Sequence, residues 1–255
     1  MHAIEIVQLN ECDTRRLLAP ALADWLTLLR RMKRLSWDVM DEASSLFDTA
    51  VLRPPHLVAH YLVARLNDEL RAVSSLTTGG LVIQALSLDA GMLEFAFTIG
   101  WVGKRIERAN KWLKWEKDQY IPHGDVLTAI NATYANGGKT DAKAKANAKV
   151  EMAHYTKLCQ IKHGNPKERE QFGIDMDEVG RPARFAVDEL SPAFIDASRM
   201  ALWYAIRYLW LGTCCYNDFH AAEAHHDVRA AQLTDLRMTI ESTRQADEMR
   251  MLTRI

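Results

Sequence analysis

The chain has 255 residues, 48% of them hydrophobic, and its 32 basic and 33 acidic side chains give a formal net charge of −1. These proportions are typical of a globular protein with its own core. They exclude a disordered or fibrous chain and an overall attraction to nucleic acid. The first residues lack the basic and apolar segments of a signal peptide, and no apolar run reaches the roughly 18 residues of a membrane span. We therefore expect a cytoplasmic protein with no membrane partner.

Apolar side chains recur every three to four residues through most of the chain, and only 12 Gly and 7 Pro interrupt it. This periodicity predicts helices at 14–34 and at 36–50, and a third helix that begins at Pro54. The run at 81–101 is apolar on almost all sides, as expected of the central helix of a bundle.

The second half of the chain continues the helical pattern with one exception. An amphipathic helix is predicted at 104–119, and an Ala- and Lys-rich segment begins another helix at 141–163. The segment 172–188 alternates around a Gly-Arg-Pro turn, which predicts a small β-hairpin. A long, broadly apolar helix then starts at Pro192.

No internal repeat and no linker divides the chain, so we predict a single all-α domain, a helical bundle with at most one small hairpin. Its N-terminal helices occupy 1–50, its core 54–226, and a C-terminal tail or packing helix 227–255. The aromatic stripe of the helix from Pro192 is wider than one neighbouring helix can cover, which predicts a homodimer.

The first group of candidate catalytic residues lies near the end of the helix at 141–163. Tyr155, Cys159 and His163 follow one another at four-residue spacing and so share a face, and the helix dipole favours an imidazolium at His163. With Lys157, such a histidine can bind and cleave a phosphodiester, one group stabilising the anion and the other transferring a proton. The alternative, which we favour because the motif is short, is that His163 caps the helix and Tyr155 packs inward.

Glu94 is a further catalytic candidate, because it lies within the apolar run at 81–101. A buried carboxylate costs several kcal/mol unless it is paired. Lys104, Arg105, Arg108 or His163 would make it a structural ion pair, whereas an acid in an apolar stripe also marks functional sites.

A metal site is the third possibility. Glu151 and His154, and again Glu223 and His226, match the three-residue spacing of ligand pairs in di-iron carboxylate bundles. The separate glutamates that complete such a site are not identifiable, and the four cysteines have no metal-site spacing. We therefore expect no cofactor.

RNA is a candidate partner because lysines lie beside Trp112 and Trp115, whose rings could stack on bases. At a net charge near zero, lysines on the solvated face of an amphipathic helix explain the same pattern more simply.

Four segments carry a resemblance to known families: QALSLDAGMLEFAFTIGW, ERANKWLKWE, HYTKLCQIKHGNP and ALWYAIRYLWL. Together they resemble domain-of-unknown-function family 5677, a family of uncharacterised bacterial helical proteins, over about 66–220. This resemblance implies a helical bundle without an established activity.

The third segment is also similar to the HEPN bundles, which include ribonucleases that compose their site across a dimer. Lys157 stands where their signature has Arg, Leu158 replaces its polar neighbour, and His163 matches. Because the signature is incomplete, we expect a non-enzymatic interaction or regulatory protein of a bacterial defence or mobile-element system. The alternatives are a metal-independent HEPN-type ribonuclease and a helical-bundle metal protein.

Overall fold

The computed structural model describes residues 3–45, 53–103, 105–114, 128–131, 133, 141–163, 192–220 and 225–252. All regular structure in these ranges is helical, which confirms the predicted all-α bundle. The helices are α1 (Ala3–Ala21), α2 (Ala23–Ser45), α3 (Pro54–Thr78), α4 (Val82–Val102), α5 (Ile106–Leu113), α7 (Asp141–Lys162), α9 (Pro192–Asn217), the short 3₁₀ helix η1 (Asp218–His220) and α10 (His226–Leu252). The predicted hairpin at 172–188 lies outside the described residues.

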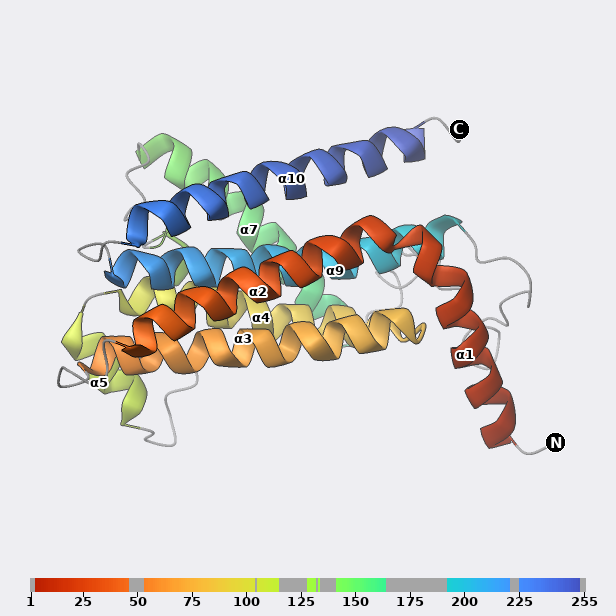
Figure 1. The fold of residues 1–255 in the computed structure, drawn as a ribbon, viewed down its shortest axis with the longest axis horizontal. Coiled ribbons are helices and arrows are strands. Elements are labelled where there is room, and N and C mark those ends of the chain that lie inside the picture. The colour runs from red at the N-terminus through yellow and green to blue at the C-terminus, as the bar shows by residue number, and fades with distance from the viewer. Residues whose placement is uncertain are drawn as a thin grey trace.

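Three helices, α3, α4 and α9, form the centre of the bundle, where each packs against the other two (Figure 1). Helix α2 lies against α9 and α3, α7 against α4, and α10 against α9 and α2. The aromatic stripe of α9 is therefore covered largely from within the chain. The homodimer stays a prediction.

Helix α4 is long and apolar enough to cross a membrane by length and composition, contrary to the expectation that no run would reach that length. In the structure 61% of this stretch is buried inside the bundle. A helix packed against neighbours on all sides needs the same apolar circumference as one in lipid, so its central position accounts for its composition.

The first two helices divide at a different place from the predicted one. The chain bends at Leu22, where α1 leaves the long axis of the bundle, and α2 then continues without interruption to Ser45 (Figure 1). Pro20 lacks the N–H that would continue the helical hydrogen bonds of α1, which favours a bend here. Ser36, expected at a helix start, is instead buried within α2 and accepts a 2.8 Å hydrogen bond from the Asn67 amide.

Helix α9 lies close to α3 and α4 at Gly212. A Cβ atom at this position would lie 2.5 Å from Leu66 Cδ1 and 3.2 Å from Ile99 Cδ1. Glycine therefore permits this helix spacing, which brings α9 into the centre of the bundle.

Candidate functional site

A groove lies on the surface of the bundle where α7 and α10 flank α9. Its floor is α9, its two walls are α7 and α10, and it encloses a cavity of about 480 Å³. In Figure 1, α10 runs above α9, and the N-terminal part of α7 lies beside α10. We call this cavity the α9 groove.

Aromatic and basic side chains alternate along the floor of the α9 groove. Trp203, Arg207 and Trp210 follow one another at spacings of four and three residues, so they share one face of α9. The Arg207 guanidinium lies 5.4 Å from the centre of the Trp203 ring and 5.6 Å from that of Tyr208. Both distances are within the range of cation–π contacts.

The α10 wall adds two more arginines to these rings. Arg244 lies 5.4 Å from the ring centre of Trp203, and Arg237 lies 5.6 Å from that of Trp210. The two tryptophans are seven residues apart on α9, and the two arginines are seven residues apart on α10. The two arginine–tryptophan pairs are therefore two helical turns apart, and α9 and α10 run antiparallel along them.

Arg207 is fixed by a carboxylate from the opposite wall. Both of its terminal nitrogens contact the two carboxylate oxygens of Glu151, whose side chain is only 1% exposed. A two-point contact of this kind sets the orientation of the guanidinium as well as its position. It also joins α7 to α9 at the centre of the groove.

Arg237 and Arg244 are held far less firmly. Each pairs with a glutamate one turn further along α10, Arg237 with Glu241 at 2.7 Å and Arg244 with Glu248 at 3.0 Å. The two glutamate side chains are 54% and 53% exposed. An exposed pair such as Arg237–Glu241 is typically worth only about 0.2–1 kcal/mol, about the cost of ordering the side chains. Arg244 is itself 18% exposed, but its partner Glu248 faces solvent, so both arginines can change partners.

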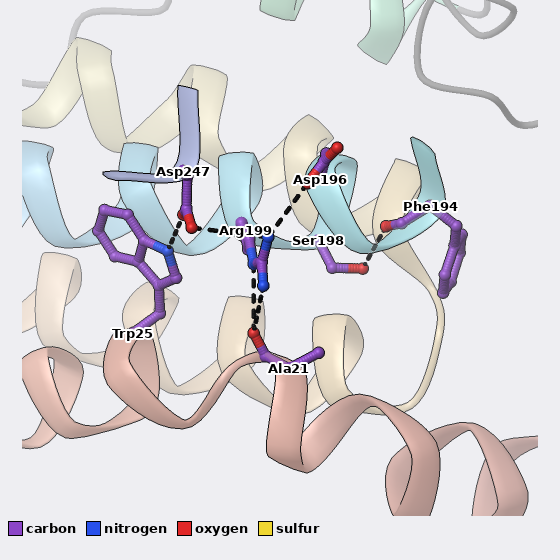
Figure 2. Close-up of polar contacts among 7 residues, drawn as sticks. All are labelled: Ala21, Trp25, Phe194, Asp196, Ser198, Arg199 and Asp247. Atoms are coloured by element: carbon purple, nitrogen blue, oxygen red, sulfur yellow. Dashed lines mark hydrogen bonds and ion pairs between the residues drawn. The ribbon is translucent and has the colours of Figure 1, made fainter. Parts of the chain in front are cut away.

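The C-terminal part of α10 is anchored by a buried polar cluster (Figure 2). Asp247 accepts a 2.7 Å hydrogen bond from Trp25 Nε1 and lies 3.5 Å from Arg199 Nη1. Arg199 also donates to the Ala21 carbonyl at the end of α1 and pairs with Asp196 at 3.2 Å. This cluster joins α10 to α9 and to the bend between α1 and α2.

The N-terminal part of α10 is anchored separately. Arg229 binds the carboxylate of Glu42 on α2, and this hydrogen bond lowers the pKa of Glu42 from its usual value. Trp210 Nε1 donates a 2.8 Å hydrogen bond to the Leu233 carbonyl. Because α10 is held on both sides of Arg237 and Arg244, the wall of the groove is formed before any ligand binds.

The cysteines of the groove are not activated nucleophiles. Burial raises the pKa of Cys215 to about 12 and raises the pKa of Cys214 well above its usual value. Both thiols therefore stay protonated at neutral pH, and a thiolate is the form that reacts.

The structure brings together two of the four predicted catalytic residues. The Tyr155 hydroxyl on α7 donates a 2.7 Å hydrogen bond to Glu94 Oε1 on α4, so the partner of Glu94 is a tyrosine rather than a base. Burial, with the nearby Glu94, raises the pKa of Tyr155 above its usual value, so the hydroxyl keeps its proton. Arg108, one of the expected partners, donates to the Trp101 carbonyl instead.

The other two, Lys157 and His163, lie near the C-terminal end of α7 and just beyond it. They are six positions apart in the chain, and continuing the helical geometry of α7 to His163 places them about 120° apart around the axis. His163 is exposed in the turn that follows α7, where its backbone N–H donates to the Cys159 carbonyl at 2.9 Å. Neither side chain lines the α9 groove.

The two pairs of the predicted metal site stand differently: His154 Nδ1 lies 3.8 Å from Glu151 Oε2, but other side chains engage both residues. Glu151 binds Arg207 in the groove, and the His154 ring packs against Trp203 and Tyr204. His226 lies at the start of α10, with its Nδ1 3.0 Å from Asp227 Oδ1, while Glu223 lies outside the described residues. Within the described ranges, no three His, Cys, Asp or Glu side chains are arranged to hold a metal ion.

The sequence analysis did not identify the arginines of the α10 wall, because they lie in the polar segment 227–255. The equal seven-residue spacings of Arg237 and Arg244 and of Trp203 and Trp210 were the available signal. That signal acquires meaning only when the two helices are known to lie side by side.

No family model matches the chain, and no curated protein or solved structure matches it significantly.

Proposed function

We propose that this is a non-enzymatic helical protein of the interaction or regulatory class, which acts by binding a small ligand in the α9 groove. The observation that carries this proposal is a cavity of about 480 Å³ whose α10 wall is anchored on both sides. Small-molecule sites typically occupy about 300–1,000 Å³ and are largely formed in advance.

The arrangement of reactive groups supports binding rather than catalysis. Burial keeps the thiols of Cys214 and Cys215 protonated. The ribonuclease hypothesis requires Lys157 and His163 to act on one phosphate, and their positions around α7 do not favour this. We therefore rank ribonuclease activity second.

A groove-filling substitution tests the proposal. Val150 lines the α7 wall and is 53% exposed. The larger side chain of Val150→Trp should therefore occupy part of the groove without entering the core. The matched control is Val228→Trp, at a position on α10 that is 57% exposed and does not line the groove. Thermal unfolding is measured with a library of small anions, cations and neutral compounds.

We expect at least one compound to raise the melting temperature of the wild type and of Val228→Trp, but not that of Val150→Trp. At a concentration of 100 times Kd, a ligand stabilises a protein by about 2.7 kcal/mol, or roughly 5–11 °C for a chain of this length. If no compound in the library raised the melting temperature of the wild type, the proposal would be contradicted. Chelator-resistant RNA cleavage that is lost in His163→Ala at an unchanged melting temperature would also contradict it.

A further inference from the structure

We infer that the ligand of the α9 groove is a small planar aromatic anion, bound by Arg237 and Arg244 through its carboxylate or phosphate. This inference rests on the proposed function and specifies the ligand class of the same site. It follows from the state of each charge in the groove and from the shape of the surfaces around them.

The arginines of the groove divide into one that is fixed and two that can exchange partners. Glu151, almost fully buried, holds Arg207 at two points. Among the carboxylates of the described residues, Arg237 and Arg244 pair with exposed glutamates of their own helix. An incoming anion can replace those glutamates at little cost, because the displaced carboxylates return to water.

The carboxylate of Asp218 disfavours binding of an anion at its own end of the groove. Asp218 also lines the cavity, with a side chain that is 76% exposed. It lies fifteen residues beyond Trp203 in the chain, roughly 20 Å along the axis of α9. The anionic group therefore binds between Arg237 and Arg244, away from this carboxylate.

The surfaces around the arginines are planar, which selects for an aromatic ligand. Guanidinium groups lie over Trp203 and Trp210 from two different helices. A flat ring can lie against indole and guanidinium planes alike, whereas a puckered aliphatic ring touches them only in part. The groove therefore offers charge for the acid and planar surface for the ring.

Four compounds separate these contributions in isothermal titration calorimetry. The compounds are 2-naphthoate, 1-naphthyl phosphate, the neutral 2-naphthalenemethanol and the non-aromatic cyclohexanecarboxylate. We expect one or both naphthyl anions to bind, and which of them binds more tightly distinguishes a carboxylate from a phosphate ligand. The neutral and the non-aromatic compounds should each bind at least tenfold more weakly.

Arginine substitutions then locate the binding. Arg237→Gln changes a side chain that is 49% exposed, so the fold is preserved, and affinity for the naphthyl anion should fall about tenfold. The control is Arg71→Gln on α3, a position that is 73% exposed and does not line the groove, and it should leave affinity unchanged.

The outcomes distinguish this inference from the proposed function. Equal binding of the neutral alcohol, or full affinity in Arg237→Gln, overturns the aromatic anion but leaves a ligand groove intact. The same holds if no naphthyl anion binds while another compound stabilises the wild type and not Val150→Trp. If no compound of either series binds, both are wrong.

Discussion

Removing the carboxylate of Asp247 should destabilise the protein more than any surface substitution, because two buried donors depend on it. The side chains of Asp247 and Arg199 are 4% and 8% exposed, and Trp25 is 1% exposed. Asp247→Ala leaves the indole N–H without an acceptor, which costs about 1–3 kcal/mol, and removes one ion pair from Arg199. Arg199 keeps Asp196 and the Ala21 carbonyl, so the buried charge is not left alone.

From these contributions we expect Asp247→Ala to lower the free energy of unfolding by about 2–4 kcal/mol. For a chain of this length the melting temperature should fall by roughly 4–16 °C. The control is Asp13→Ala, which removes an exposed 3.5 Å pair with Arg16 and should cost under about 0.5 kcal/mol.

A double-mutant cycle isolates the hydrogen bond itself. Trp25→Phe keeps an aromatic ring in the core but removes the N–H donor, and the cycle combines it with Asp247→Ala in urea unfolding. A hydrogen bond to a charged group predicts a coupling of about 1.5–3 kcal/mol. A coupling near zero, with Asp247→Ala within about 0.5 kcal/mol of wild type, would refute the view that this contact anchors α10.

Two further substitutions test the core. Gly212→Ala should destabilise the protein by about 1–3 kcal/mol in urea unfolding, because the new Cβ would lie 2.5 Å from Leu66 Cδ1. At Gly91 the described residues place no atom outside the adjacent backbone of α4 within 4 Å of a new Cβ, so Gly91→Ala should be neutral or stabilise α4. Equal effects at the two sites would contradict the packing argument. Burial without a hydrogen-bond partner raises the pKa of Asp89 well above its usual 3.8, so the folded state retains a proton that the unfolded state loses. As pH rises above about 3.8, the folding equilibrium constant should therefore fall by about tenfold per pH unit until the raised pKa is passed. Between pH 5 and pH 8 the melting temperature should fall less for Asp89→Asn than for the wild type. Parallel pH profiles of the two proteins would show that this carboxyl does not titrate as described.

Local chemistry allowed most helices to be predicted from the sequence. Pro54 and Pro192 begin α3 and α9, and the apolar run at 81–101 corresponds to α4 within a residue at each end. These features depend on residues three or four positions apart, so periodicity and proline geometry are sufficient. The same reasoning misplaced the division between α1 and α2. The actual bend follows Pro20, whereas Ser36 is held inside α2 by a hydrogen bond from α3.

The candidate site depended instead on which helices lie together. Trp25 and Asp247 are 222 positions apart, and Glu94 and Tyr155 are 61 apart, so no local pattern could pair them. A periodic sequence determines which face of a helix is apolar, because that requires only the helix geometry. The neighbour that each face meets is decided by packing across the whole bundle, and this placed the arginines of α10 over the tryptophans of α9.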